Sequence, residues 1–490
     1  MMISTTQLDE VMIKADKAFH EYKNVSASER ARFIRTISEK IEALGEDLIQ
    51  TAMAESHLPE VRLKGERGRT TGQLNSFSKL LEAGDWVEAS IDLADADRKP
   101  APKPDLRKML FPIGPVVVFG ASNFPLAFST AGGDTASALA AGCSVIVKSH
   151  PAHPKTSAMV ASAIQNAIAA CKMPTNVFQH IEDSSIDVGQ KLVQHPLTKA
   201  AAFTGSYQGG KALFDLANKR EEPIPVFAEM GSINPVVLLP ESIKQNKDLP
   251  SLLATSITVG VGQFCTNPGL LLAIEDESLN LFLSSLSEHL NKVAPSKMLH
   301  KGIASNFKHR KSESLTQSGV TALAEVIVAE EEFGAAALAT VSANDFLKSS
   351  VLKEEVFGPY SLVVKCRNKE ELLKVIQSLR GQLTATLFGW RDELNNYKDV
   401  ADALQQRCGR LIFNGVPTGV EVCKSMHHGG PFPSTTDSRY TSVGVDAIYR
   451  FVRPVSFQDF PSDLLPLELR NYNKLNILRC VNGDWTRNHI

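Results

Sequence analysis

The sequence predicts an α/β protein in which short buried strands alternate with helices. Two observations support this prediction. The first hundred residues show the spacing of amphipathic helices, and from about residue 113 onward β-branched runs alternate with alanine-rich helical runs. Strand and helix in alternation imply a parallel sheet covered on both faces, with ligand sites beyond the carboxyl ends of the strands. This is a nucleotide-binding type of architecture.

Size and composition indicate a multi-domain globular enzyme. A chain of 490 residues exceeds one hydrophobic core, so we expect roughly two to four domains. The net charge of −2 gives no electrostatic reason to expect nucleic acid or an anionic membrane as a partner. The most apolar stretch, 131–147, contains Asp134, and the amino terminus is unlike a secretory signal. We therefore expect a soluble cytoplasmic protein.

Seven cysteines are scattered along the chain without close pairs. A disulfide framework or a zinc site normally requires closely spaced or paired cysteines. We therefore expect reduced thiols and no metal cofactor.

The amino-terminal region is predicted to be helical. Ser26 and Glu29 have the spacing of a capping box. Apolar residues follow at helical intervals, which gives one amphipathic face with no chemistry implied: Ile34, Ile37, Ile41, Leu44 and Leu48. The segment 92–112 is polar and rich in proline, where a helix cannot persist, so we expect an exposed connector or hairpin.

Two series of strands and helices follow this connector. In the first series we expect strands at 115–119, 144–147, 177–181 and 199–203, and helices at 130–141, 156–171 and 186–193. In the second we expect helices at 252–261 and 370–379, and strands at 270–274, 384–388 and 410–413. The segment 453–460 is predicted to be an edge strand of the kind that pairs with a partner subunit.

The first candidate for chemistry is Cys265. An apolar helical run ends in Gly260 and Gly262, and the thiol is followed closely by Pro268, so a turn presents it. A thiolate adds readily to an aldehyde, and collapse of the thiohemiacetal expels a hydride and leaves a thioester. Taken alone, a cysteine in this setting is more often a buried small hydrophobe.

Glu229 follows an apolar strand directly and precedes Met230 and Gly231. Partial desolvation there is expected to raise the pKa of its carboxyl toward neutrality, which suits a general base that deprotonates water or a thiol. From this segment alone, a structural ion pair at the strand end is about as probable.

Two loops after strands complete the candidate site. The amide of Asn123 is placed to join the backbone N–H of Cys265 in stabilising an oxyanion, although an asparagine in a loop is usually a turn former. Gly205, Ser206 and Lys211 follow a strand and open a helix, which is the right context for phosphate on backbone N–H groups. Their spacing is not Gly-x-Gly-x-x-Gly, so this pattern has low specificity.

Together these motifs resemble those of the aldehyde dehydrogenase superfamily, from about Ser26 onward. Asn-Phe-Pro lies at 123–125, Phe-Thr-Gly-Ser at 203–206, Glu-x-Gly-x-x-x-Pro at 229–235, Gly-Gln-x-Cys at 262–265 and Glu-Glu-x-Phe-Gly-Pro at 354–359. They occur in the order found in the family, which makes chance agreement negligible.

The resemblance implies the roles of the site residues. It implies Cys265 as the nucleophile, Glu229 as the base and Asn123 as the oxyanion donor. It places Glu355 and Phe357 at the nicotinamide ribose, Lys148 at the adenosine ribose and Ser206 at the pyrophosphate, with hydride transfer at an interdomain site.

The resemblance also implies an aldehyde dehydrogenase-like α/β architecture with three parts. These are a Rossmann-type cofactor domain at 1–92 and 113–228, an α/β catalytic domain at 229–448, and a small oligomerisation arm with the C-terminal tail at 93–112 and 449–490. A homodimer or homotetramer is expected.

Two departures from the family pattern stand out. The usual Lys-Pro-x-Glu is here Lys148-Ser149-His150-Pro151, which lacks the acid that binds the adenosine ribose and so removes a repulsion against a 2′-phosphate. Lys211 lies where NADP-using relatives carry a basic residue. We therefore expect NADP as the cofactor, with NAD also usable. The chain starts close to its first long helix, so we do not expect the leading strands that are common in the family.

Finer motifs at 120–128, 131–138, 413–420 and 428–431 are similar to those of 2,5-dioxopentanoate dehydrogenases, and nearly as similar to those of an NADP-dependent fatty aldehyde dehydrogenase. For an anionic keto-aldehyde we expect a cation to bind the far carboxylate, and Arg439 is one candidate. His427 and His428 are candidates for the site entrance, although adjacent histidines in such a loop are more often solvated or satisfied locally.

Two other functional classes are weighed against a hydrolytic dehydrogenase. A CoA-acylating relative commonly lacks the base, and Glu229 is present. A non-catalytic relative would have lost the nucleophile, and Cys265 is retained.

Overall fold

The amino-terminal part of the protein consists of four helices. The computed structural model describes residues 3–490, so the first two residues of the predicted segment 1–92 lie outside the described chain. The Ser26 hydroxyl accepts a hydrogen bond from the N–H of Glu29, whose carboxylate accepts one from the N–H of Ser26, and this confirms the predicted capping box. The helices are α1 (Thr5–Tyr22), α2 (Ala27–Glu42), α3 (Gly45–Ser56) and α4 (Glu60–Ala83).

The first sheet is parallel, with the strand order β5-β4-β3-β6-β7. Its strands are β3 (Val116–Phe119), β4 (Val145–Lys148), β5 (Phe178–Ile181), β6 (Ala200–Thr204) and β7 (Val226–Glu229). The connecting helices are α5 (Gly133–Ala141), α6 (Pro154–Cys171), α7 (Ile186–Gln194) and α8 (Tyr207–Asn218). This arrangement confirms the predicted α/β fold.

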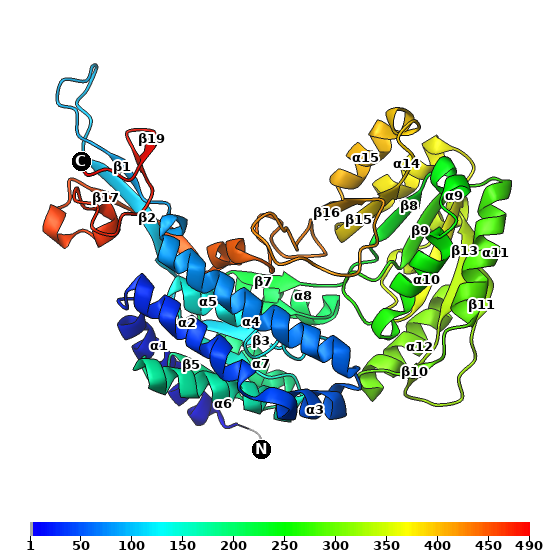
Figure 1. The fold of residues 1–490 in the computed structure, drawn as a ribbon, viewed down its shortest axis with the longest axis horizontal. Helices are drawn as coiled ribbons and strands as arrows, with labels where there is room; N and C mark the ends of the chain where they lie inside the picture. The colour runs from blue at the N-terminus through cyan, green and yellow to red at the C-terminus, as the bar shows by residue number, and fades with distance from the viewer. Residues whose placement is uncertain (1–2) are drawn as a thin grey trace.

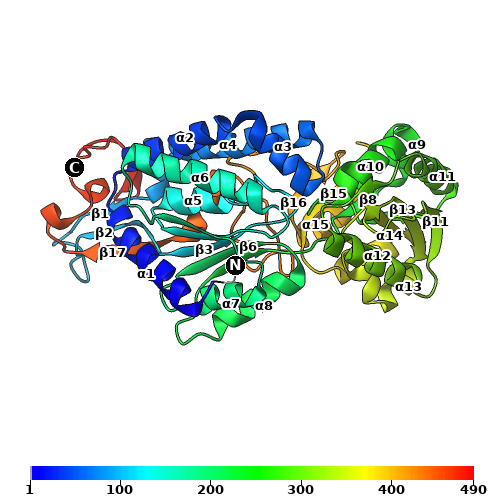
Figure 2. The same cartoon turned by 90° about the horizontal axis from the view of Figure 1, so that it is seen from below.

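Both faces of this sheet are buried, as its apolar strands require. Val116 and Val118 pack into the core that includes α2, α4, α5 and α6, whereas Val117 packs against α1 and α7. Figure 2 shows these two helical layers above and below the sheet. The side chains alternate because successive residues of a strand point to opposite faces.

A second sheet of five strands, β17-β2-β1-β18-β19, projects from this body at the end where the chain terminates (Figure 1). Its strands are β1 (Ser90–Asp92), β2 (Leu106–Pro112), β17 (Val452–Gln458), β18 (Arg479–Val481) and β19 (Asp484–Thr486). Four 3-10 turns flank them: η1 (Asp85–Val87), η5 (Val445–Phe451), η6 (Ser462–Leu464) and η7 (Leu467–Leu469). The segment 92–112 is therefore a hairpin, and the segment 453–460 supplies an edge strand, as predicted.

The third sheet has seven strands in the order β11-β13-β14-β9-β8-β15-β16, all parallel except β11. The strands are β8 (Pro235–Leu238), β9 (Leu270–Ile274), β11 (Thr321–Glu325), β13 (Ala337–Ser342), β14 (Tyr360–Cys366), β15 (Gln382–Phe388) and β16 (Cys408–Phe413), and a small pair is formed by β10 (Ser296–Lys297) and β12 (Phe333–Gly334). The helices and turns are α9 (Pro240–Gln245), α10 (Leu249–Thr258), η2 (Val259–Gly262), α11 (Glu277–Asn291), α12 (Lys301–Leu315), α13 (Ala343–Lys348), η3 (Val351–Lys353), α14 (Lys369–Ser378), η4 (Leu394–Tyr397) and α15 (Lys398–Gln405).

The bounds of two predicted helices differ from those in the structure by three residues. The helix expected at 130–141 begins at Gly133, because the N–H groups of Gly132 and Gly133 donate to Ser129 and Ala127 in a preceding turn. The helix expected at 252–261 runs from Leu249 to Thr258 and stops there because Gly260 and Val261 have left-handed backbones. Among the described residues, no helix is both long and apolar enough to span a bilayer. The domain boundaries stay a prediction.

Candidate active site

The thiol of Cys265 lies on a turn that follows α10 and η2, as expected. Three consecutive residues before it have positive φ angles: Gly260 (59°), Val261 (56°) and Gly262 (64°). A β-branched residue in this region is strained, and such strain persists only where the surroundings fix the backbone. A Cβ on Gly262 would lie 2.3 Å from the carbonyl carbon of Gly358, so only glycine fits there. The loop is therefore held in one shape beneath the thiol.

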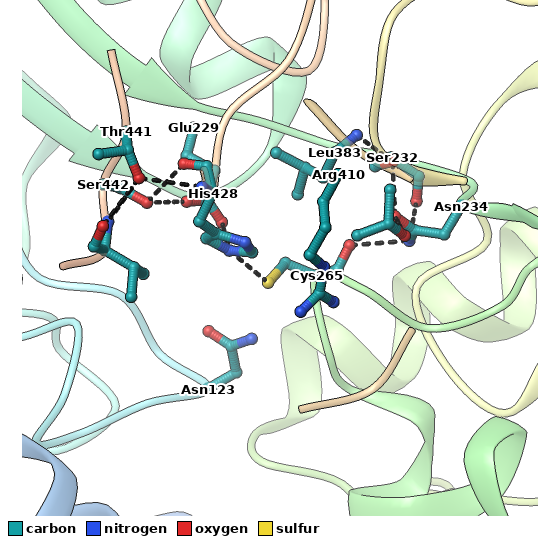
Figure 3. Close-up of polar contacts among 12 residues, drawn as sticks. Asn123, Glu229, Ser232, Asn234, Cys265, Leu383, Arg410, His428, Thr441 and Ser442 are labelled. Carbon is teal, nitrogen blue, oxygen red and sulfur yellow. Dashed lines mark hydrogen bonds and ion pairs between the residues drawn. The ribbon is translucent and has the colours of Figure 1, made fainter. Parts of the chain in front are cut away.

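His428 lies between the thiol and the carboxylate of Glu229 (Figure 3). Its Nε2 is 3.6 Å from Cys265 Sγ and 3.2 Å from Glu229 Oε1. The other carboxylate oxygen of Glu229 accepts a hydrogen bond of 2.6 Å from the hydroxyl of Ser442. The side chains of His428 and Glu229 are only 0% and 3% exposed. The structure thus brings Cys265 and Glu229 into one buried cluster.

The backbone around Glu229 explains how its carboxylate reaches the thiol. Glu229 is the last residue of β7, and its carbonyl accepts a hydrogen bond of 3.0 Å from the N–H of Gly205. It also forms an isolated bridge with Thr435, and the N–H of Met230 donates to the carbonyl of Ser434. The strand end is therefore tied to the segment that carries His428 and Ser442.

The expectation that the pKa of Glu229 is raised was wrong. Burial does raise the pKa of this carboxyl, but the imidazole of His428, the hydroxyl of Ser442 and the thiol of Cys265 outweigh burial, so the pKa lies below its usual value. The prediction from the sequence took account of burial. It did not include the hydrogen-bond partners of Glu229, because these are distant along the chain. The carboxylate is therefore ionised and ready to accept a proton at neutral pH.

The pKa of the Cys265 thiol is shifted in the opposite direction, above its ordinary value. Burial and the nearby negative charge of Glu229 raise the pKa of this thiol well above its ordinary value, and the positive charge of Arg69 opposes them. A neutral thiol beside an ionised carboxylate is a donor–acceptor pair for one proton. These opposite shifts keep the proton on the thiol in the resting protein, and the carboxylate is the nearby acceptor for that proton when the sulfur reacts.

Asn123 follows β3 and points toward the same space as the thiol in Figure 3. One N–H of its amide donates to the carbonyl oxygen of Gln263 at 3.1 Å, which ties it to the loop of Cys265. An amide carries two N–H donors, so one is left for a substrate oxygen. The role of Asn123 as an oxyanion donor stays a prediction.

Asn234 positions Cys265, and sequence reasoning missed it. It has a left-handed backbone (φ 47°) and is fully buried. Its amide donates to the carbonyl oxygens of Cys265 and Asn267, both at 2.9 Å. An asparagine before a proline is a turn signal in the sequence, and asparagine tolerates a left-handed backbone. Only the fold shows that its side chain binds the loop of Cys265.

Arg439, the candidate for the substrate carboxylate, is paired instead with Asp437 at an exposed position, so that expectation was wrong. Arg69 on α4 is the cation whose charge acts on Cys265. The Nε of Arg69 is buried without a hydrogen-bond partner among the described residues, and the guanidinium lies over the rings of Phe124 and Phe128 at 5.7 and 5.1 Å. Burial lowers the pKa of Arg69, and the charges of Glu66 and Cys265 oppose this shift.

His428 is buried at the centre of the site and does not line its entrance, contrary to expectation. The backbone N–H of His428 donates a hydrogen bond of 2.9 Å to the hydroxyl of Thr441, which fixes the loop that carries the ring. His427 is only half-buried. The local pattern of histidine, glycine and proline carries no signal that distinguishes the two rings, because the side chains that contact the buried ring, Glu229 and Cys265, are 199 and 163 residues away.

The predicted phosphate loop opens helix α8. Ser206 is the N-cap, and its hydroxyl accepts a hydrogen bond from the N–H of Gly209 at 3.2 Å. Gly205 and Ser206 are exposed, and the first turn of a helix offers further N–H groups to an anion. Lys211 forms an ion pair with Asp215 at 2.6 Å. The loop is therefore accessible and suited to a pyrophosphate.

Lys148 ends β4, which pairs with β3, the strand that leads to Asn123; β3 in turn pairs with β6, the strand that leads to Ser206. Burial lowers the pKa of Lys148, and the charge of Asp183 opposes this shift. The carboxylate of Asp183 is itself occupied by the N–H groups of Ile3 and Ser185. His150 is neutral, because burial lowers its pKa to about 3. Lys148 is thus the cation at this end of the sheet.

Glu355 and Phe357 share a pocket with Phe264, beside the loop of Cys265. Burial raises the pKa of the Glu355 carboxyl to about 7, and the backbone N–H of Ser232 opposes this shift. A Cβ on Gly231 would lie 2.6 Å from a carboxylate oxygen of Glu355, so glycine permits this approach. Glu355 and Phe357 therefore lie close to the loop of the thiol, and their role in binding a dinucleotide stays a prediction.

The sequence of this chain is similar to those of known proteins. Residues 2–452 match a family model described as the aldehyde dehydrogenase family. The chain is 48% identical over 471 residues to alpha-ketoglutaric semialdehyde dehydrogenase 2 of Azospirillum brasilense, which covers 96% of this chain and 90% of the relative. It is 44% identical over 490 residues to alpha-ketoglutaric semialdehyde dehydrogenase of Acinetobacter baylyi. That match covers 98% of this chain and 92% of the relative.

Solved structures show the same fold at low identity. Betaine aldehyde dehydrogenase of Staphylococcus aureus, crystallised with NAD+, matches with a TM-score of 0.79 at 17% identity over 94% of this chain and 90% of that one. Proline utilization A of Bdellovibrio bacteriovorus, a longer protein, matches with a TM-score of 0.77 at 20% identity over 93% of this chain and 46% of that one. These matches confirm the predicted fold class.

Proposed function

The chain belongs to the aldehyde dehydrogenase family, and on that premise we propose that it oxidises 2,5-dioxopentanoate to 2-oxoglutarate. The aldehyde, water and an oxidised nicotinamide dinucleotide give the carboxylate, the reduced dinucleotide and two protons. The observation that supports this chemistry best is the cluster of Cys265, His428 and Glu229, in which a neutral thiol lies close to an ionised carboxylate.

The first step forms a bond between Cys265 Sγ and the aldehyde carbon. Glu229 accepts the proton of the thiol, and the imidazole of His428 lies where it can pass that proton on. The carbonyl oxygen becomes an oxyanion, for which Asn123 and the backbone N–H of Cys265 are the proposed donors.

The residues proposed for the cofactor come from the ends of the first sheet and from the pocket beside the loop of Cys265. Ser206 and Gly205 are proposed to bind the pyrophosphate, Lys148 the adenosine ribose, and Glu355 and Phe357 the nicotinamide ribose. A bound nicotinamide dinucleotide supplies the acceptor for the hydride that leaves the former aldehyde carbon. Cys265 then carries a thioester.

The second step hydrolyses this thioester. Glu229 takes a proton from water, the hydroxide attacks the acyl carbon, and the sulfur of Cys265 leaves as a thiolate that is reprotonated. Ser442 holds one oxygen of Glu229 and leaves the other to act as the base. The presence of this base favours hydrolysis over transfer of the acyl group to CoA.

Arg69 supports a substrate with a carboxylate at the far end. Its buried guanidinium has an unpartnered Nε and no ion pair among the described residues, and its charge acts on Cys265. A buried cation gains most from an anionic partner, and a bidentate arginine–carboxylate pair is the strong form of that contact. The two relatives of 44–48% identity are named for the same semialdehyde.

A long-chain fatty aldehyde is the second candidate. The apolar rings of Phe124, Phe128 and Phe264 favour it, because they form a wall beside the thiol. Arg69 and the neighbouring Arg62 lie over these same rings, which argues against an entirely apolar tunnel. We therefore place this alternative second.

For the dinucleotide we propose a preference for NADP. The stretch from Lys148 to Pro151 has no carboxylate to repel a 2′-phosphate, and Lys148 offers a positive charge. Lys211 contributes less than the sequence suggested, because its ammonium is paired with Asp215. NAD is expected to be used as well.

A panel of initial rates tests the proposed substrate. It contains 2,5-dioxopentanoate, succinate semialdehyde, glutaraldehyde and decanal, each with NAD and with NADP. We expect 2,5-dioxopentanoate with NADP to have the highest kcat/KM. If decanal has the highest value, the fatty aldehyde alternative is correct.

A further inference from the structure

Three atoms that are good ligands for a transition metal meet at the catalytic cluster. Cys265 Sγ, His428 Nε2 and a carboxylate oxygen of Glu229 all lie within 4.8 Å of one another. Glu229 and His428 are buried and Cys265 is half-buried. The proposed aldehyde chemistry uses these groups for proton transfer and needs no metal, so their ability to bind one is a separate property.

The spacing of these atoms suits tetrahedral zinc. With Zn–S of about 2.3 Å and Zn–N and Zn–O of about 2.0–2.1 Å, tetrahedral angles put sulfur and nitrogen about 3.6 Å apart and nitrogen and oxygen about 3.3 Å apart. The structure has 3.6 Å between Cys265 Sγ and His428 Nε2, and 3.2 Å between His428 Nε2 and Glu229 Oε1. Two of the three spacings thus match a tetrahedral ion, and the third, between Cys265 Sγ and the carboxylate of Glu229, lies within 4.8 Å.

Hydrogen bonds to neighbouring residues hold the carboxylate of Glu229 and the backbone of His428 in place. Ser442 donates to Glu229 Oε2 at 2.6 Å, which leaves Oε1 on the side of the cluster. The backbone of His428 is fixed by Thr441. His428 Nδ1 makes no hydrogen bond among the described residues, so it can carry the ring proton without breaking one when Nε2 binds a metal. Such outer contacts orient metal ligands in known sites.

We propose that Zn2+ binds Cys265 Sγ, His428 Nε2 and Glu229 Oε1, and reversibly inhibits the enzyme. Binding displaces the proton of the Cys265 thiol to solvent, and three protein ligands leave the fourth position to water. The metal-bound sulfur cannot attack an aldehyde, and the carboxylate cannot act as a base. Zinc therefore competes with catalysis for the same three side chains.

Cobalt spectroscopy tests this site without aldehyde or dinucleotide, so its result is independent of the proposed substrate. We expect Co2+ to bind the full-length protein with one-to-one stoichiometry, to give a thiolate-to-cobalt charge-transfer band in the near ultraviolet, and to be displaced by Zn2+. Cys265→Ser should abolish the band. His428→Gln should weaken zinc binding about tenfold or more, because it removes a ligand.

Two matched variants serve as controls. Cys423→Ser removes an exposed thiol and His427→Ala removes the neighbouring imidazole, and both should retain the band and the zinc affinity. A band that survives in Cys265→Ser, or zinc affinity that is unchanged in His428→Gln, overturns the proposal.

Alkylation of the wild-type protein gives a second measurement that needs no variant. Bound Zn2+ should slow the reaction of iodoacetamide with Cys265 at least tenfold, as followed by peptide mass spectrometry, and a chelator should restore the rate. The exposed Cys423 should react at the same rate throughout. Equal alkylation of Cys265 with and without zinc contradicts the site.

Discussion

The pKa values of Cys265 and Glu229 are shifted in opposite directions, so the thiol is the proton donor and the carboxylate is the proton acceptor. Burial and Glu229 keep the thiol protonated, whereas His428 and Ser442 keep the carboxylate ionised. A stable thiolate would be open to oxidation, but a thiol beside a base is activated only as it reacts. The environment therefore protects the nucleophile between turnovers.

Arg69 gives a prediction about substrate choice. Arg69→Met should lower kcat/KM for 2,5-dioxopentanoate relative to pentanal about 10- to 100-fold, because a hydrogen bond to a charged group contributes about 1.5–3 kcal/mol. Taking the ratio of two aldehydes removes any general effect on the thiol. Arg67→Met on the same helix, where Arg67 pairs with Glu42 at 3.1 Å, should leave the ratio unchanged. An unchanged ratio in Arg69→Met excludes this residue as the carboxylate partner.

Glu355 gives a prediction about pH. Its carboxyl has a pKa of about 7, so it is neutral at pH 6 and ionised at pH 8. An ionised carboxylate accepts ribose hydroxyl groups better, so the Kd for NADH or NADPH should fall as the pH rises from 6 to 8. Calorimetric titration of the protein with NADH or NADPH at these pH values measures the Kd. Glu355→Gln should flatten this dependence and Glu354→Gln, at an exposed position, should preserve it.

At the residue scale, the sequence indicated the thiol, the base and the amide, but it placed His428 at the entrance and did not indicate Ser442 or Arg69. Cys265 and Glu229 lie in local patterns that a reader of the sequence can recognise. His428 and Ser442 are 199 and 213 residues from Glu229, and Arg69 lies on a helix with no chemical motif. Local patterns do not contain such contacts, and the direction of the Glu229 pKa shift depends on them.

The loop between α10 and β9 is the element that sets the position of the nucleophile. Its left-handed residues stop the helix and turn the chain, and Gly262 lies against the backbone of Gly358. Asn234 holds the same loop from the other side through the carbonyl of Cys265. The loop is thus braced by segments that precede and follow it in the sequence.

Gly262→Ala tests this bracing. The added Cβ meets backbone atoms and the residue has φ 64°, so the free energy of unfolding should fall by about 1–3 kcal/mol. A displacement of the thiol should also lower kcat about 100-fold. Urea unfolding and steady-state rates measure both effects.

Gly68→Ala, in the middle of α4 with no atom within 4 Å of the new Cβ, is the control. It should stabilise the protein by up to about 1 kcal/mol, because alanine is the better helix former, and kcat should not change. The account of the loop is wrong if Gly262→Ala behaves like this control.

Most elements could be predicted from the sequence, because β-branched and alanine-rich runs alternate clearly in the first sheet. The strands at 116–119 and 270–274 lie where the apolar runs are, and the capping box starts α2 at the expected residue. The end of α10 was predicted three residues too late, because a valine in a left-handed conformation has no sequence signature. Tertiary packing decided that boundary.

At the scale of the whole molecule, the arm sheet and the edge of the seven-stranded sheet are the features that bear on assembly. β17 and β16 are edge strands of their sheets, and Leu411 and Phe413 on β16 are large apolar residues with 42% and 50% exposure. An exposed apolar edge strand favours pairing with another chain. These features support the proposed homodimer or homotetramer.

Light scattering after size exclusion measures the assembly. We expect a mass of two or four chains for the protein, and a smaller mass for the double variant Leu411→Asp and Phe413→Asp, because charges on the edge prevent pairing. Ile327→Asp, which changes an exposed loop residue, should keep the wild-type mass. The β16 edge is not an interface if the double variant also keeps it.

The central claim is that Cys265 carries the acyl group of a keto acid and that Glu229 releases it. Rapid mixing of Glu229→Gln with 2,5-dioxopentanoate and NADP, followed by peptide mass spectrometry, tests both parts at once. We predict one equivalent of NADPH per active site, then a stall, with the acyl group on Cys265, whereas Cys265→Ala should form no NADPH. Full steady-state turnover by Glu229→Gln, or an acyl group on another cysteine, would contradict the account.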